Sequence, residues 1–217
     1  MILKIIPLVC CAVAVALLFA TWIKVPVIYE TLDLIDSATG GLAGMLGIDM
    51  SSLLSMIPID SDYSLLGSLG FVDDLKGVYS SYGGVAGAVG GDVTATFTFL
   101  QVFFIAFIVV FFVGIVLAVI GSIALIRGKG PGKALLLTGF ILLLVVSVAW
   151  ILCMFIGNGL MHSEATASLN ELNSALQMLG VSMQTLPAII APGFAPFVVA
   201  LVAVVGLVTS ALNSKKA

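Results

Sequence analysis

The sequence predicts an all-α integral membrane protein, a four-transmembrane-helix bundle with a helical extracytoplasmic layer. Of its 217 residues, 61% are hydrophobic and 9% are charged, whereas a soluble domain has about half apolar and about a quarter charged residues. The mean hydropathy is +1.29. Four apolar segments lack Asp, Glu, Lys, Arg and His, and each has the roughly 18 or more residues that a membrane-crossing helix needs.

The first element, residues 1–23, is interpreted as transmembrane helix 1. Lys4 precedes an apolar run that continues to Ile23. A cleaved signal peptide has a similar basic start and apolar run, but it ends in a small-x-small cleavage site that this segment lacks. We therefore expect the segment to be kept as a membrane anchor, with cleavage as the alternative.

The second element, residues 24–96, is expected to be a helical extracytoplasmic loop 1. Apolar residues recur at helical spacing from 28 to 46, with acidic residues on the other face, as in an amphipathic helix. Period-two alternation, which marks strands, is absent from the loop. The sequence thus predicts a cluster of short helices rather than a β-sheet. The expected N-caps of the later helices are Asp49, Asp60 or Ser61, and Asp73.

Residues 97–126 are predicted to form transmembrane helix 2. Thirty residues of helix cover about 45 Å, against a hydrocarbon core of about 30 Å, so its outer end is expected to project or tilt. Gly114, Ala118 and Ser122 form a small-xxx-small stripe, the pattern of close helix packing in membranes. We interpret the stripe as a contact within the fold rather than a dimer face.

A basic cytoplasmic turn, residues 127–133, is expected to lead into transmembrane helix 3, residues 134–156. Extracytoplasmic helical loop 2 then covers residues 157–193, with one helix capped by Ser163. Its apolar residues follow alternating steps of four and three, which predicts an outer-helix interface that docks on another helix. The interface residues are Ala165, Leu169, Leu172, Leu176 and Leu179. Transmembrane helix 4, residues 194–212, and a cytoplasmic tail, residues 213–217, complete the chain.

The charge distribution predicts the orientation, because short cytoplasmic segments are rich in Lys and Arg. Six of the eight basic residues fall on one side of the four segments and all eleven acidic residues on the other. We therefore expect a multi-pass protein of the plasma membrane with both termini in the cytoplasm. The six basic residues are Lys4, Arg127, Lys129, Lys133, Lys215 and Lys216.

The sequence offers little catalytic chemistry. His162 is the single histidine, and no nucleophile or zinc motif accompanies it. The predicted spans hold no ionisable residue, which argues against a pump or an ion-coupled transporter. We expect a non-enzyme without catalytic residues, cofactor, metal or nucleic-acid partner. Asp60, Asp62, Asp73 and Asp74 suit helix capping, and Ca²⁺ binding by this acidic loop is the alternative.

The order of spans and the loop lengths resemble those of claudin-type tetraspans and of large-pore channels such as connexins. Four spans, cytoplasmic ends, a long first outer loop and a shorter second one carry the resemblance. The paired loop cysteines of both families are missing here, since Cys10, Cys11 and Cys153 all lie in predicted spans. The resemblance is one of topology, and it assigns no residue roles.

The first functional hypothesis is a non-enzymatic structural or adhesion-type membrane protein that self-associates laterally through its outer helices. Its basis is the number of apolar side chains in the first loop, more than a small cysteine-free loop is expected to bury. The alternatives are a pore-forming subunit of a homo-oligomeric channel and an accessory subunit with other membrane proteins as partners. The apolar residues in question are Leu53, Leu54, Met56, Ile57, Leu65, Leu66, Leu69, Phe71 and Val72.

Overall fold

A computed structural model of the chain describes residues 2–26, 59–82, 93–128, 132–177 and 188–213. The elements are helix α1 (Ile2–Ala16), the 3₁₀ turn η1 (Leu17–Phe19), strands β1 (Thr21–Lys24) and β2 (Asp62–Ser64), helices α5 (Ser68–Tyr82), α6 (Val93–Ile126) and α7 (Gly132–Gln177), strand β3 (Ala191–Pro192) and helix α8 (Ala195–Asn213).

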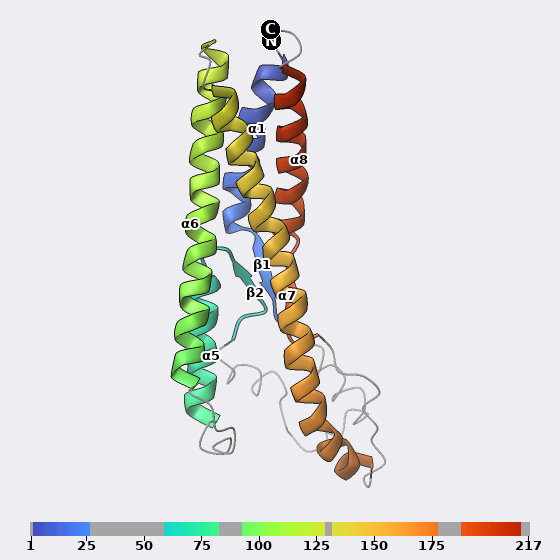
Figure 1. The fold of residues 1–217 in the computed structure, drawn as a ribbon. Helices are drawn as coiled ribbons and strands as arrows, with labels where there is room; N and C mark the ends of the chain where they lie inside the picture. Colours follow the sequence, from blue (N-terminus) through green and yellow to red (C-terminus); the bar gives the residue numbers. More distant parts are fainter. Residues whose placement is uncertain (1, 27–58, 83–92, 129–131, 178–187, 214–217) are drawn as a thin grey trace, which may run out of the picture.

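Helices α1, α6, α7 and α8 form an elongated bundle, and the strands lie at one end of α1 and α8 (Figure 1). We call this the sheet end. At the opposite end α1 begins and α8 finishes, and we call it the termini end. Helices α6 and α7 continue past the strands, and α5 lies beside the sheet-end part of α6 (Figure 1).

Three helices in the described residues are long and apolar enough to cross a membrane. Their apolar stretches are Phe97–Ile126 on α6, Gly132–Leu160 on α7 and Ala195–Leu212 on α8. Large apolar side chains cover their outward faces, as expected where lipid replaces water. The chain is therefore a membrane-embedded protein, as its composition predicts. The shorter apolar helix Lys4–Phe19 lies beside them.

The first apolar segment is not helical throughout, contrary to the prediction for residues 1–23. Helix α1 ends at Ala16, η1 follows, and Thr21–Lys24 forms β1. An apolar run cannot distinguish a buried strand from a helix by composition alone. Thr21, Trp22 and Ile23 are β-branched or aromatic, and such residues suit a strand. Trp22 and Ile23 are fully buried.

A small antiparallel sheet joins three distant parts of the chain, in the order β2-β1-β3. Lys24 of the central strand is opposite Asp62 of β2 on one side and Ala191 of β3 on the other. Pro192 can occupy β3 because an edge strand leaves one backbone direction unpaired. The prediction of helices only in the first loop is therefore wrong for residues 62–64. The fold is helical with a small sheet.

The helix boundaries after β2 also differ from the prediction. Asp60 and Ser61 precede a strand rather than capping a helix, and Asp73 lies inside α5 rather than at its start. A turn held by side chains brings the chain from β2 into α5. The Gly67 amide donates to Ser64 Oγ (3.0 Å), and Ser68 Oγ donates to the Leu65 carbonyl (2.7 Å). The helices expected between residues 27 and 58 lie outside the described residues.

Helix α7 is continuous over 46 residues. The prediction placed a break near residue 157 and a new helix start at Ser163, which is wrong. Gly157 and Gly159 lie inside the helix without ending it. At Gly157 an added Cβ would be 3.3 Å from Ile190 Cδ1, a tight contact, whereas at Gly159 nothing lies within 4 Å. Tertiary packing therefore favours a small residue at Gly157.

Candidate functional site

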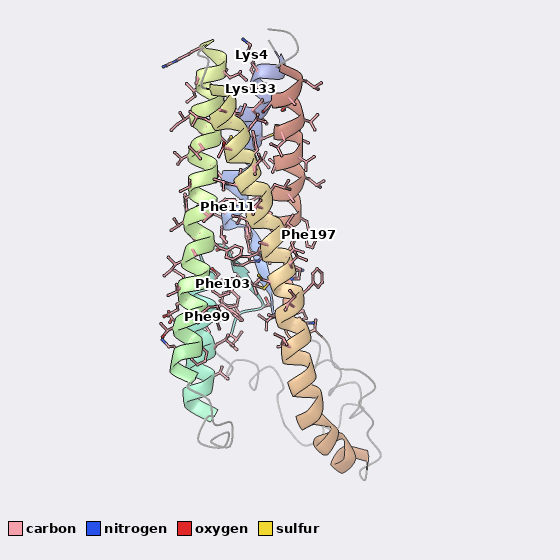
Figure 2. All side chains as sticks on the ribbon, in the orientation of Figure 1. Lys4, Phe99, Phe103, Phe111, Lys133 and Phe197 are labelled. Atoms are coloured by element: carbon pink, nitrogen blue, oxygen red, sulfur yellow. The ribbon has the colours of Figure 1, made fainter. Side chains whose placement is uncertain are left out.

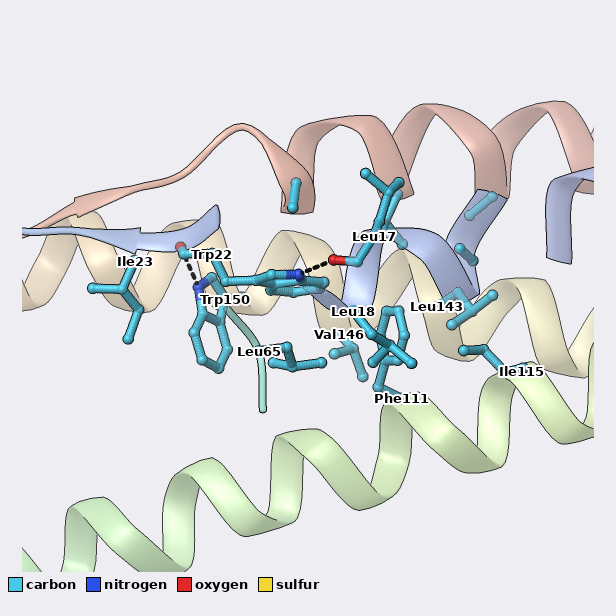
Figure 3. Close-up of a cluster of buried hydrophobic side chains, with 14 of the residues drawn as sticks. Leu17, Leu18, Trp22, Ile23, Leu65, Phe111, Ile115, Leu143, Val146 and Trp150 are labelled. Atoms are coloured by element: carbon cyan, nitrogen blue, oxygen red, sulfur yellow. Dashed lines mark hydrogen bonds between the residues drawn. The ribbon is translucent and has the colours of Figure 1, made fainter. Parts of the chain in front are cut away.

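Within the described part of the chain, the sheet end has the most varied side-chain chemistry, and Trp22 is at its centre. The indole Nε1 of Trp22 donates to the Leu17 carbonyl at 2.7 Å. The Trp22 carbonyl accepts hydrogen bonds from Trp150 Nε1 at 3.1 Å and from the Gly193 amide at 2.9 Å. The Trp150 bond attaches β1 to α7 (Figure 3), and the Gly193 bond attaches it to the segment that leads into α8.

Aromatic rings fill the space around these bonds. Trp22 meets Phe111 of α6 and Trp150 of α7 edge-on, with ring centroids 5.3 and 5.4 Å apart. Phe104 and Phe107 of α6 also pack on Trp150, each with centroids 5.3 Å apart. Three of these pairs, all except the tilted Phe104–Trp150 pair, are edge-to-face, and such pairs stabilise by about 0.5–1.5 kcal/mol each beyond simple burial. The sheet is therefore fixed to the membrane helices by its central strand.

Tyr63 fixes β2 to α5. Its hydroxyl donates to Asp74 Oδ2 at 2.6 Å and accepts from the Asp60 amide at 2.7 Å. Its ring packs on Phe71, with centroids 5.1 Å apart. Burial raises the pKa of Tyr63 well above its usual range, and the hydrogen bond to Asp74 raises it further. The phenol therefore stays protonated and able to donate at every physiological pH.

Two more polar contacts hold the sheet end together. Gln101 Nε2 of α6 donates to Asp73 Oδ1 of α5 at 3.2 Å. Asn158 Oδ1 of α7 accepts from the backbone amides of Ile189 and Ile190 at 2.8 and 3.2 Å. Asn158 thus holds the segment that leads into β3. Gln101 and Asn158 are thus polar residues on the long apolar helices α6 and α7.

The acidic residues considered for Ca²⁺ make contacts within the fold. Asp74 accepts from Tyr63, Asp73 from Gln101, and Asp62 from the Ser61 hydroxyl at 3.1 Å. Among the described residues, no group of three His, Cys, Asp or Glu side chains lies close enough to hold a metal ion. Asp74 therefore connects α5 with β2 and Asp73 connects α5 with α6, whereas Asp62 accepts from the residue before it.

The small-residue stripe Gly114, Ala118 and Ser122 lies on α6. A Cβ added at Gly114 would be 3.2 Å from the Gly139 carbonyl oxygen of α7 and equally close to Leu143. Ala118 and Ser122 are fully buried, and the Ser122 hydroxyl donates to the Ala118 carbonyl at 2.7 Å. Gly114 and Ala118 therefore lie where α6 meets α7, within one chain.

The expected outer-helix interface is placed only as backbone. Ala165, Leu169, Leu172 and Leu176 lie on the last part of α7, but their side chains are outside the described part of the chain, as is the whole of Leu179. The docking of the outer-helix interface on another helix stays a prediction.

The apolar residues of the first loop are largely covered by the chain itself. Leu65, Phe71 and Val72 are buried, Leu69 is partly buried, and Leu66 is 39% exposed. The remaining members, at 53, 54, 56 and 57, are outside the described residues. The described members of this set therefore supply little free surface for another molecule.

The sequence did not reveal the contact between Trp22 and Trp150, or the strands that Trp22 holds in place. Trp22 and Trp150 each stand near the same end of an apolar run, the position at which membrane proteins concentrate tryptophan. That position was the available indication. The hydrogen bond from Trp150 to the Trp22 carbonyl requires β1 to be a strand. The apolar run gives no indication of a strand there.

Comparison with known proteins found no match. No family model matches the chain, and neither curated proteins nor solved structures include a similar one.

Proposed function

We propose that the protein is a non-enzymatic, structural or adhesion-type tetraspan of the plasma membrane that self-associates laterally. In this proposal α1 with η1 is the fourth span. Together they are about 28 Å long at the usual rise per residue of α and 3₁₀ helices, close to the roughly 30 Å hydrocarbon core. They pack against both α6 and α8, so in this proposal they lie at the same depth in the membrane as these two apolar helices.

The charges support an orientation with both termini in the cytoplasm. Lys4 and Lys133 lie at the termini end (Figure 2), where Arg127 follows the last residue of α6. The described acidic residues of the first loop belong to β2, its approach and α5, all at the sheet end. Basic residues flank the cytoplasmic side of membrane helices, which favours the sheet end as the outer one.

The observation that carries self-association is an apolar surface on α7 at the level of polar groups. Asn158 binds the backbone of Ile189 and Ile190. The next residue, Ala191, pairs with Lys24 in β1, and Lys24 is exposed. This part of α7, the end of the apolar stretch Gly132–Leu160, is therefore level with a charged strand, and the proposal places it at the headgroups, beyond a hydrocarbon core of about 30 Å.

Three large side chains on this part of α7 are nevertheless exposed. Phe155 is 58%, Ile156 62% and Leu160 65% exposed. Lipid tails do not reach past the headgroups, and water disfavours such a surface. The same surface on a second copy would cover it in an isologous contact, which closes as a two-fold dimer. We call Phe155, Ile156 and Leu160 the α7 outer patch.

The test compares the oligomer distribution of three proteins in mild detergent by native mass spectrometry at several concentrations. Ile156→Lys combined with Leu160→Lys should shift the distribution toward monomer, because two desolvated charges weaken an apolar contact by several kcal/mol. Leu66→Lys is the control, since Leu66 is an exposed apolar residue at the sheet end that lies outside the α7 outer patch. The control should keep the wild-type distribution.

A wild-type protein that is monomeric at every concentration would refute lateral self-association and leave the accessory-subunit alternative, which co-purification of partners tests. Oligomers that persist in the double variant would place the contact elsewhere than on the α7 outer patch. Conductance of oligomers reconstituted in liposomes would favour the pore alternative over a purely structural role.

A further inference from the structure

A shallow groove lies between α6 and α7. Its volume is about 210 Å³, and it is open on one side. Three residues of α6 and three of α7 line it, and every lining residue is apolar. They are Ala106, Phe107, Val110, Val145, Val146 and Ala149. The two alanines, one on each helix, leave the space that larger side chains would fill.

The position of the groove along the helices places it in the membrane. Ala149 is 16 residues from Lys133 on α7, and Val110 is 17 residues from Arg127 on α6. At 1.5 Å per residue these separations are about 24–26 Å from the charged termini end, within a hydrocarbon core of about 30 Å. The groove therefore faces lipid tails in the half of the bilayer nearer the sheet.

Phenylalanines continue the apolar wall from the groove toward the sheet end. Phe99, Phe103 and Phe107 follow one another at steps of four on α6, so they share one face. Their rings are in contact, with centroids 6.2 Å apart between the first two and 4.6 Å between the last two. Figure 2 shows Phe99 farther from the termini end than Phe103, and Phe99 is 68% exposed.

Three properties of the groove select its occupant. Water would find no hydrogen-bonding partner among six apolar side chains. A volume of about 210 Å³ is below the usual 300–1,000 Å³ of sites for compact small molecules, and a helix of a second copy, about 10–12 Å across, would not enter it. A flexible hydrocarbon chain is narrow enough and is the surrounding solvent at this depth.

We propose that the groove binds one acyl chain of a membrane lipid from the leaflet at the sheet end, with Phe107 as its aromatic wall and Ala106 and Ala149 as the sides of its hollow. This site is separate from the α7 outer patch, and its occupation does not depend on self-association.

The test uses the full chain in vesicles of phosphatidylcholine that carry a small fraction of the same lipid with a diazirine midway along one acyl chain. After illumination, peptide mass spectrometry locates the labelled residues. Labelling of segments 103–110 and 145–149 should exceed labelling around Leu201 and Val205 of α8, which are also exposed to lipid. Equal labelling of the groove and α8 would mean ordinary lipid contact and would overturn the proposal.

Filling the groove provides the second arm of the test. Ala106→Leu with Ala149→Leu should lower groove labelling about tenfold, the effect of losing about two buried methylenes of the lipid chain. Val148→Leu, on the exposed face of α7, is the control and should leave it unchanged. Unchanged labelling of the filled variant, or cross-links from the groove to a second copy, would refute acyl-chain binding. If the filled variant does not fold, the wild-type comparison of groove with α8 decides alone.

Discussion

Tyr63 illustrates how single residues hold the sheet end together. Its hydroxyl connects the carboxylate of Asp74 on α5 with the amide of Asp60, on opposite sides of β2 in the sequence. Deleting the hydroxyl removes both hydrogen bonds and leaves two polar groups without this partner. Such a loss costs about 1–3 kcal/mol when the groups are buried, and these are partly buried.

We expect Tyr63→Phe to lower the apparent melting temperature at neutral pH, and the difference from wild type to shrink in alkali. The pKa of Tyr63 is raised in the folded protein, so the unfolded chain loses this proton first. The stabilisation is complete below the unfolded pKa of about 10 and declines as the pH rises above it. Thermal unfolding at pH 7 to 11 measures the difference, and a constant difference throughout would contradict this assignment.

At the scale of elements, the contact between α6 and α7 depends on glycines on both helices. A Cβ added at Gly139 would be 2.5 Å from the Ala118 amide nitrogen and 2.7 Å from the Gly114 carbonyl oxygen. At Gly121 it would meet the Leu136 backbone. Backbone atoms cannot move aside as side chains do, so substitution must separate the helices. Van der Waals contact of this kind is what holds helices together in lipid.

Gly139→Val should therefore destabilise the bundle by about 1–3 kcal/mol, the usual cost of overpacking. Gly159→Val is the matched control, because it makes the same change in the same helix where nothing lies within 4 Å. Tryptophan fluorescence during heating reports on both variants through Trp22 and Trp150. Equal melting temperatures for the two variants would contradict the close contact.

The sequence predicts one side of this helix contact and not the other. Gly114, Ala118 and Ser122 form a recognisable repeat of small residues, but their neighbours on α7 include Leu143 beside Gly139, so small residues are mixed with large ones on that face. The end of α1 was not predictable for a related reason. Trp22 and Ile23 are as apolar as a helix in lipid requires. Only the pairing of this segment with distant residues makes it a strand: Ile23 lies opposite Tyr63 and Pro192, 40 and 169 positions later in the chain.

At the scale of the whole molecule, composition and charge predict membrane embedding and the long apolar helices, because these depend on sums over many residues. The continuity of α7 beyond its apolar stretch was not predicted, since in the sequence Gly157 and Gly159 resemble helix terminators. The contact of Gly157 with Ile190 is visible only in the structure. The number of spans and their orientation remain predictions that the charge distribution supports.

A labelling experiment tests that orientation. In a background with Cys10, Cys11 and Cys153 replaced by alanine, a cysteine at Ser61 should react with an impermeant maleimide added to intact cells. A cysteine at Gly130, in the basic turn, should react only after the cells are opened. Ser61 lies next to β2 at the sheet end, so the pair tests both sides of the membrane. Labelling of Gly130→Cys in intact cells would reverse the proposed topology.

The order of strands in the sheet has a consequence for synthesis of the chain. β1 is made among the first 24 residues, whereas β3 is residues 191 and 192. One edge of β1 therefore stays unpaired while α6 and α7 are synthesised. Unpaired strand edges tend to pair with other chains. The Gly193 amide, which reaches the Trp22 carbonyl, arrives just ahead of α8. The segment that leads into α8 thus completes the sheet, and a chain interrupted before residue 191 would present an open strand edge.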